Sequence, residues 1–273
     1  MRKGASWFNM VSVTFGLAFL YLPIALLIAY SFNAGRLVTV WSGFSFRWYA
    51  ALLHDQQMLD AAWMTIRLGV VSATLATVLG TLAAVGLVRG GRFRGRLLFS
   101  GMTYAPLVMP EVIMGLSMLL LFVAVGMQRG FWTLLIAHTT FTLCYVTVVV
   151  QSRLITFDKS LEEAAQDLGC PPWRVFFEIT LPNIAPAVAA GWMLALTLSL
   201  DDLVTSSFVA GPGSTTLPMR IYSQVRLGVS PEINAVCTIL IGLVATGVII
   251  ASVVGKLRND PQGGVAGLAR AAA

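Results

Sequence analysis

Long apolar runs alternate with short polar segments along this chain of 273 residues. An α-helix needs about 20 apolar residues to cross a bilayer, whereas β-barrel strands are shorter and alternate apolar with polar positions. The runs that reach helical length lie at about 10–31, 62–88, 98–125, 131–151, 184–209 and 235–255. The pattern therefore predicts an all-α integral membrane protein with six transmembrane helices.

Composition supports this class. The chain is 57% hydrophobic and only 11% charged, whereas soluble domains carry roughly 25% charged residues. The net charge of +6 comes from Lys and Arg placed between the apolar runs, where they set topology, so it does not indicate nucleic-acid binding. Cys144, Cys170 and Cys237 are scattered and lack metal-ligand spacing, so we expect them to be unpaired.

The distribution of basic residues predicts that both termini are cytoplasmic. An N-in orientation places twelve Lys and Arg inside: Arg2, Lys3, Arg89, Arg92, Arg94, Arg96, Arg153, Lys159, Arg174, Lys256, Arg258 and Arg270. It places five outside: Arg36, Arg47, Arg129, Arg220 and Arg226. The first run is too long for the roughly 7–15 apolar residues of a signal peptide, so we expect an uncleaved span. We expect one domain over 1–258, a flexible tail over 259–273, and a cytoplasmic segment 152–183.

The first outer loop and the second span carry features of a membrane interface. Trp41, Trp48 and Tyr49 fit an aromatic belt, and 46–61 is a candidate short amphipathic helix. Arg67, near the outer end of its span, is expected to snorkel. The segment 211–218 either lines an outer vestibule or is a turn.

The longest polar interval between apolar runs is 160–182. Ser160 followed by Glu163 has the spacing of a capping box, which predicts a helix from about Leu161. Helical spacing places four small or apolar residues on one face: Leu161, Ala164, Ala165 and Leu168. Gly169 suits the left-handed end of a helix, and the prolines that follow open a second helix. This compact element is expected to dock on a partner.

Three acids lie at membrane depth, where charge is costly and suggests function. Glu111 follows Pro106 and Pro110, which should kink or break the third span, and Tyr104 lies seven residues earlier on the same helical face. Asp201 and Asp202 lie in the fifth span.

Polar neighbours accompany these acids. Helical spacing joins Ser199 to Asp202, and Tyr145 to His138. An acidic cavity lined by Glu111, Asp201, Asp202, Tyr104, Ser199 and Tyr145 would suit a cationic substrate. The alternative is hydrogen bonding between helices or with a partner subunit, which we favour for His138. No Walker A motif, metal-ligand cluster or nucleophile elbow is present in the sequence, so an enzyme is not expected and any ATP would be used by another subunit.

The 160–182 segment resembles the EAA motif of permease subunits of binding-protein-dependent ABC importers. The motif residues stand at the family spacing without departure: Glu163, Ala164, Ala165, Gly169, Ile179, Leu181 and Pro182. The resemblance implies the type I ABC importer permease fold, with 161–169 as the coupling helix in a groove of a cytoplasmic ATPase dimer. ATP-Mg would be used by that ATPase, and this chain would bind no cofactor.

A narrower resemblance points to polyamine permeases, putrescine permeases in particular. It rests on Leu37–Trp41, Arg47–Tyr49, Ala105–Pro110, Ser199–Asp202, Gly211–Pro212, Thr216–Pro218 and Pro231–Asn234. The resembling group has Asp at the position of Glu111, so this chain keeps the charge with a longer reach.

The resemblance implies import of a polyamine, with putrescine favoured, by alternating access in a bacterial inner membrane. It also implies a second, unlike permease and a periplasmic binding protein as partners. Spermidine, a cationic amino acid and an ATP-independent secondary transporter stay open as alternatives.

Overall fold

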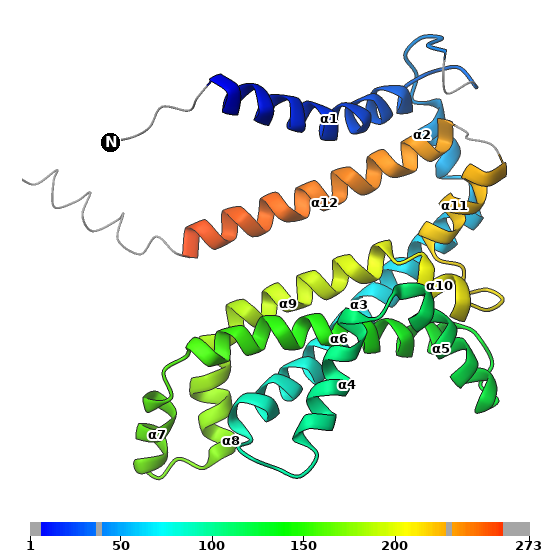
Figure 1. Cartoon of the computed structure of the whole chain (residues 1–273). Helices are drawn as coiled ribbons and strands as arrows, with labels where there is room; N and C mark the ends of the chain where they lie inside the picture. The colour runs from blue at the N-terminus through cyan, green and yellow to red at the C-terminus, as the bar shows by residue number, and fades with distance from the viewer. Residues whose placement is uncertain (1–6, 37–39, 228–230, 259–273) are drawn as a thin grey trace, which may run out of the picture. The chain divides into compact units, whose positions relative to one another are not determined.

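The computed structural model describes residues 7–36, 40–227 and 231–258 (Figure 1). The described part is helical, with one isolated bridge between Asn33 and Phe44. The expected flexible tail 259–273 and the basic residues Arg2 and Lys3 lie outside the described residues. The chain divides into two compact units, one built from the two ends of the chain and one from residues 57–223.

The first unit contains α1 (Trp7–Ser31), α2 (Arg47–Leu52) and α12 (Pro231–Arg258), and α12 packs against both α1 and α2. The loop after α1 is held by its own side chains. Asn33 Nδ2 donates to the Val40 carbonyl at 2.7 Å, and the Trp48 indole donates to the Asn33 carbonyl at 2.8 Å. The expected short helix after position 46 is confirmed as α2, although the rest of 46–61 belongs largely to the start of the next helix.

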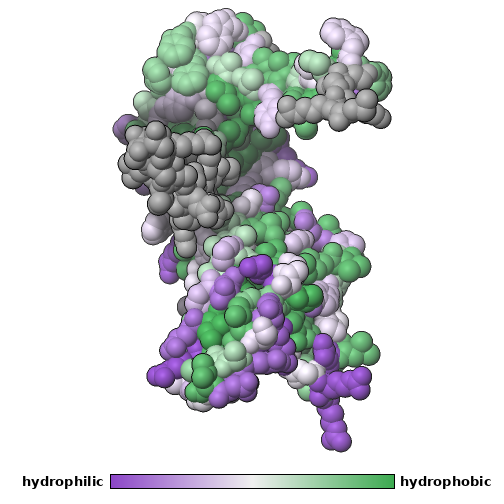
Figure 2. Space-filling model, turned by 90° about the vertical axis from the view of Figure 1, so that its left-hand side faces the viewer, coloured by the Kyte–Doolittle hydropathy of each residue, from purple (hydrophilic) through white to green (hydrophobic). Residues whose placement is uncertain are grey.

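The second unit is a helical bundle. Its members are α3 (Gln56–Arg89), α4 (Arg96–Val108), α5 (Glu111–Ala124), α6 (Phe131–Thr156), α7 (Ser160–Asp167), α8 (Pro172–Val175), the π-helical turn η1 (Phe176–Thr180), α9 (Leu181–Asp201), α10 (Val204–Val209) and α11 (Leu217–Leu227), which runs across the boundary to the first unit. At the end that carries α7 and α8 in Figure 1, hydrophilic side chains gather on the face shown in Figure 2.

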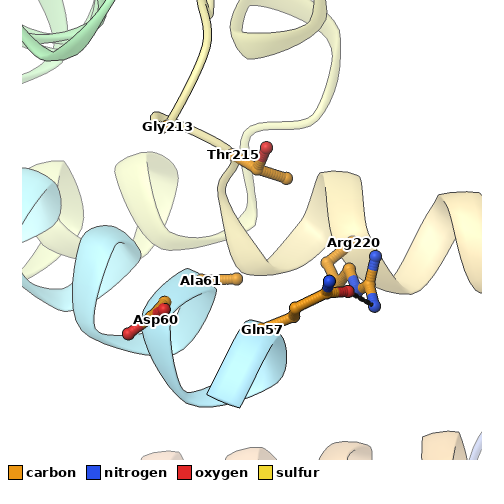
Figure 3. Close-up of a pocket in the computed structure, with 6 residues that line it drawn as sticks. All are labelled: Gln57, Asp60, Ala61, Gly213, Thr215 and Arg220. Carbon is orange, nitrogen blue, oxygen red and sulfur yellow. Dashed lines mark hydrogen bonds between the residues drawn. The ribbon is translucent and has the colours of Figure 1, made fainter. Parts of the chain in front are cut away.

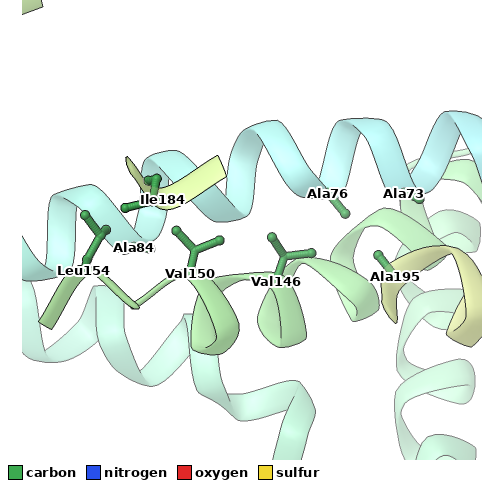
Figure 4. Packing of buried hydrophobic residues seen from close by; sticks show 8 residues of the cluster. All are labelled: Ala73, Ala76, Ala84, Val146, Val150, Leu154, Ile184 and Ala195. Atoms are coloured by element: carbon green, nitrogen blue, oxygen red, sulfur yellow. The ribbon is translucent and has the colours of Figure 1, made fainter. Parts of the chain in front are cut away.

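Small side chains let α3, α6 and α9 approach closely in the core of this unit. Figure 4 shows the buried cluster formed by Ala73, Ala76, Ala84, Val146, Val150, Leu154, Ile184 and Ala195. At Gly80 an added Cβ would lie 2.9 Å from Val146 Cβ, so only glycine fits. Such small-residue contacts are how helices pack inside a bilayer, where lipid supplies no hydrophobic drive.

Several buried hydroxyl groups in this bundle bond to their own helix. Thr77, Thr142 and Thr147 each donate to the carbonyl four residues earlier, at 2.7–2.8 Å. This bonding removes unpaired polar atoms from the helix surface, as an apolar surrounding requires.

Two of the expected spans are broken helices. The 98–125 run forms α4 and α5, which meet at 120° across Met109 and Pro110. The predicted break near the proline pair is confirmed. The 184–209 run forms α9 and α10, because Asp202 adopts an extended backbone (φ −64°, ψ 113°). A continuous fifth helix to residue 209 is therefore wrong.

Four described helices are long and apolar enough to cross a membrane: Trp7–Ser31, Gln56–Arg89, Phe131–Thr156 and Pro172–Asp201. The α4–α5 pair makes a fifth if both halves form one span, and α12 is a shorter apolar helix over its described side chains. The second short helix expected after Pro171 is continuous with α9, because α8, η1 and α9 form one 30-residue helix.

Candidate functional site

The end of α7 follows its sequence signals closely. Gly169 has φ +85°, a conformation that disfavours side chains. Its N–H donates to the Gln166 carbonyl at 2.9 Å, and the Cys170 N–H donates to the Ala165 carbonyl at 3.0 Å. This pair of bonds is a Schellman motif, which stops the helix. Pro172 then opens α8, as predicted.

The start of α7 differs from the predicted capping box. The helix begins at Ser160, and the Ser160 N–H donates to Asp158 Oδ1 at 3.0 Å. Hydrogen bonds from the Ser160 backbone and side chain lower the pKa of the Asp158 carboxyl. Glu163 instead forms an exposed ion pair with Lys159, with 2.8 Å between Oε1 and Nζ. Asp158 therefore takes the capping role that the sequence assigned to Ser160 and Glu163.

Packing of α7 buries one side and leaves the other open. Glu162 and Ala165 are buried in the chain itself, whereas Leu161 is 49% and Leu168 87% exposed. Of the four residues on the predicted face, Leu161, Ala164 and Leu168 are exposed, whereas Ala165 turns inward and is buried.

The remaining motif residues lie where α7 meets the long helix. Ile179 belongs to η1, Leu181 packs against the core cluster, and Pro182 occupies the first turn of α9. These residues fix how α8 and η1 lead into α9.

Glu111 is the first residue of α5 and is exposed. Its negative charge at this position is favoured by the helix dipole. The break at Pro110 places Tyr104 on a different helix, so the prediction that the two share a helical face is wrong. The Tyr104 hydroxyl donates to the Gln151 side chain of α6. Tyr145 is half-buried, and its ring lies edge-on to Phe141 with 5.2 Å between centroids.

Asp202 lies at the break between α9 and α10 and is buried, with its side chain 7% exposed. It accepts the backbone N–H groups of Thr205 and Ser206 at 3.2 and 2.8 Å and the Ser206 hydroxyl at 2.8 Å. His138 Nε2 lies 3.2 Å from Asp202 Oδ2. Both carboxylate oxygens thus have partners, and in this conformation Asp202 holds the start of α10.

The same network continues through serine hydroxyls. His138 Nδ1 lies 2.7 Å from Ser199 Oγ, which lies 3.0 Å from Ser72 Oγ. The network links α3, α6, α9 and α10 inside the bundle. His138 is the packing hydrogen-bonder that we favoured from the sequence. Asp201, the last residue of α9, is exposed outside this network.

A pocket of about 360 Å³ lies at the start of α3, and the sequence did not indicate it. It is lined by Gln57, Asp60, Ala61, Gly213, Thr215 and Arg220 (Figure 3). Arg220 Nη2 donates to the Gln57 side-chain oxygen. The lining comes from two segments far apart in the chain, so spacing along the sequence gave no signal for it.

The Gly211–Pro218 segment that borders this pocket is rigidly placed. An added Cβ at Gly211 would clash with the Arg129 carbonyl oxygen. The Leu217 N–H donates to Thr65 Oγ1 at 2.7 Å. The loop thus contributes Gly213 and Thr215 to a pocket wall, in addition to turning the chain.

A family model decides the kind of protein. Residues 76–258, which include α7 and all three acids, match the binding-protein-dependent transport system inner membrane component. This chain belongs to that family of permeases. The permease is accordingly a transport component and not an enzyme.

Curated relatives cover most of the permease. It is 54% identical over 242 residues to the putrescine transport system permease protein PotI of Escherichia coli strain K12, covering 86% of each chain. It is 47% identical over 239 residues to the spermidine/putrescine transport system permease protein PotC of the same strain, covering 88% of this chain and 90% of the relative.

Solved structures share the fold. A bacterial ABC transporter involved in the import of the acidic polysaccharide alginate matches with a TM-score of 0.71 at 19% identity, covering 91% of the permease and 94% of that chain. The MetNI methionine ABC transporter matches with a TM-score of 0.60 at 17% identity, covering 74% and 94%. The permease therefore has an ABC importer permease fold.

Proposed function

We propose that this permease is a membrane subunit of an ATP-driven importer that moves putrescine, or a closely related polyamine, into the cytoplasm. The observation that carries the proposal is the 54% identity to a putrescine permease over 86% of both chains.

We propose six spans with both termini inside a bacterial inner membrane. The four long helices and the α4–α5 pair account for up to five crossings by length and hydropathy, and the shorter apolar helix α12 is the proposed sixth. The Lys and Arg bias supports the orientation, which places α7 on the cytoplasmic side.

The open face of α7 is the proposed docking site for a cytoplasmic ATPase dimer. Leu161 and Leu168 offer apolar contact and Glu163 offers charge, and these residues have no competing place in the core. ATP-Mg would be held by the ATPase. A second, unlike permease and a periplasmic binding protein complete the proposed assembly. A bacterial alginate ABC transporter of the same fold has been solved in complex with an alginate pentasaccharide-bound periplasmic protein, which supports the last of these partners.

For the substrate, the exposed acids are the best candidates for contact with an ammonium group. Glu111 and Asp201 present their carboxylates outside the buried network, whereas Asp202 and Ser199 are occupied within it. Asp202, Ser199, Tyr104 and Tyr145 would then shape the pathway and reach substrate only after a conformational change.

Spermidine is the second candidate substrate, because relatives named for spermidine and putrescine are 44–47% identical to this chain. Uptake of labelled putrescine and labelled spermidine, each with the other as unlabelled competitor, distinguishes them in cells with and without this permease. We expect putrescine uptake to depend on the permease and to resist competition by equimolar spermidine. Equal putrescine uptake in both cell lines would refute the proposal.

A further inference from the structure

Three elements meet at one buried ion pair beneath α7. Arg89, the last residue of α3, places Nε 2.8 Å from Glu162 Oε2. Thr180, the last residue of η1, donates its hydroxyl to Glu162 Oε1 at 2.7 Å. One carboxylate therefore joins α7 both to α3 and to the long helix that continues as α9.

The ion pair between Arg89 and Glu162 is more deeply buried than the other ion pairs of the region. The side chains of Arg89 and Glu162 are 19% and 9% exposed, whereas those of Lys159 and Glu163 are 64% and 58% exposed. Exposed pairs contribute little and separate freely in water. Separating a largely buried pair leaves an uncompensated charge inside the protein, which is costly. The pair between Arg89 and Glu162 therefore holds α7 firmly against the bundle.

Further contacts fix the α3 side of the cluster. The Arg89 guanidinium lies 6.0 Å from the ring centroid of buried Phe157, which follows the end of α6. Arg96 Nη2 donates to the Leu87 carbonyl at 2.7 Å, which ties the last turn of α3 to α4. A displacement of Glu162 would therefore pull on the C-terminal end of α3, which Arg89 and Leu87 connect to neighbouring elements.

The π-helical turn fixes the third side. An extra residue in the turn Phe176–Thr180 sets the direction of Thr180 relative to α9. π-Helical turns are rare in proteins overall, and those that do occur are often found at functional sites. Thr180 is almost fully buried, and its hydroxyl lies 3.5 Å from the Val175 carbonyl, so its shorter bond is the one to Glu162.

We propose that Arg89, Glu162 and Thr180 form a latch that transmits movement of α7 to α3 and α9. These are positioning residues: Glu162 faces inward, away from the open face of α7, and carries the displacement into the bundle. The inference rests on the proposed function, because it takes the ATPase as the source of that displacement. It assigns transmission to Glu162, whose side chain is buried, next to the exposed motif residue Glu163.

The test uses the complete assembly in nanodiscs, with hydrogen exchange measured with and without trapped ATP. In the wild type we expect ATP to change exchange in α7, in the last turns of α3 and in the first turns of α9. In Glu162→Gln we expect the change to remain in α7 and to be lost in α3 and α9. In Arg89→Gln we expect it to be lost in α3 only, because the bond between Thr180 and Glu162 is still present. In liposomes that contain the same assembly, transported polyamine per ATP hydrolysed should fall about tenfold in Glu162→Gln, on the order of a typical coupling between two sites.

Matched variants exclude general damage. Arg174→Gln breaks an exposed ion pair with Glu178 in the same region and should leave exchange and coupling unchanged. The double variant Arg89→Gln/Glu162→Gln should be no worse than Glu162→Gln alone, because the ion pair with Arg89 is already lost in that single variant. Thr180→Val keeps the shape of the side chain and removes only its hydroxyl. This variant tests the latch if the charge variants fail to fold.

The outcomes are distinct for the two proposals. The latch would be overturned if ATP changed exchange in α3 and α9 of Glu162→Gln or Thr180→Val as much as it does in the wild type. It would also be overturned if ATP changed exchange only in α7 of the wild type. A wild type that shows all three exchange changes but no polyamine uptake would support the latch and refute the proposed substrate.

Discussion

Two pairs of adjacent acids occupy the two regions that matter most, Glu162–Glu163 in α7 and Asp201–Asp202 at the end of α9. In each pair one carboxylate turns into the protein and meets partners: Glu162 meets Arg89 and Thr180, and Asp202 meets His138 and Ser206. The neighbouring acid stays exposed.

The difference has two origins: Glu162 and Glu163 both lie within the helix α7, whereas Asp202 leaves the helix with an extended backbone directly after Asp201. Adjacent residues on a helix point about 100° apart, so one acid can join the fold while the next one is available to another molecule. The inward acids hold an element in place, and we expect the outward acids to act on a partner or a substrate. Charge alone, read from the sequence, cannot distinguish the two roles.

The largest effect should come from the inward acid at the helix break. Asp202→Ala removes the hydrogen-bond partner of two backbone N–H groups and the neighbour of His138, and leaving a buried polar group unpaired costs about 1–3 kcal/mol. Asp201→Ala should cost no more than about 0.5 kcal/mol, as for ordinary surface positions. Thermal unfolding of both variants in the same detergent measures the difference, and equal losses would break the comparison.

The outward acid of α7 should affect function and not folding. Glu163→Lys reverses a charge that is exposed and paired with Lys159. We expect normal amounts of permease in the membrane but at least roughly a tenfold loss of uptake, because the ATPase is no longer held. Co-purification of the ATPase with the permease checks this directly. Retained ATPase and normal uptake would mean that the open face of α7 is not the docking face.

The outward acids near the proposed pathway should show smaller effects. Asp201→Asn and Glu111→Gln each remove one solvent-accessible negative charge, which should raise the KM for putrescine about fivefold with little change in the maximal rate. Initial uptake rates over a substrate titration provide the measurement. An unchanged KM in both variants would mean that Asp201 and Glu111 do not contact the substrate, and Asp202, Tyr104 and Tyr145 would become the candidates.

The smallest effect concerns the first turn of α7. The Ser160 N–H lowers the pKa of Asp158, so the folded state favours the carboxylate. Its contribution is present above the ordinary aspartate pKa of about 4 and is lost as pH falls through the lowered value. The protection of α7 amides, taken relative to their intrinsic exchange rates, should decrease on acidification below about pH 4 in the wild type and show a weaker pH dependence in Asp158→Asn. The same pH dependence in both proteins would mean that the Asp158 carboxylate does not stabilise the start of α7.

Local signals in the sequence predicted local structure well. The Gly169 stop, the Pro172 start and the break near Pro110 were all anticipated, because each depends on the backbone preferences of one or two residues. The break at Asp202 was missed. No proline or glycine marks it, and one of the partners of Asp202 there, His138, lies far earlier in the chain.

Long-range contacts explain what the sequence could not reveal at the site. The partner of Glu162 is Arg89, on a helix that ends before the third predicted span begins. In the sequence, Glu162 is therefore indistinguishable from any other polar residue of a solvated helix. The pocket at Asp60 and Arg220 likewise needs the fold to bring its walls together.

The central claim is that the permease moves polyamine only as part of an ATP-driven assembly. Liposomes containing either the purified permease alone or the complete assembly, each with labelled putrescine outside, test it most directly. We predict uptake only by the complete assembly with ATP on the α7 side, and no flux through the permease alone under an ion or substrate gradient. Gradient-driven putrescine flux through the permease alone would contradict this claim and would indicate a secondary transporter.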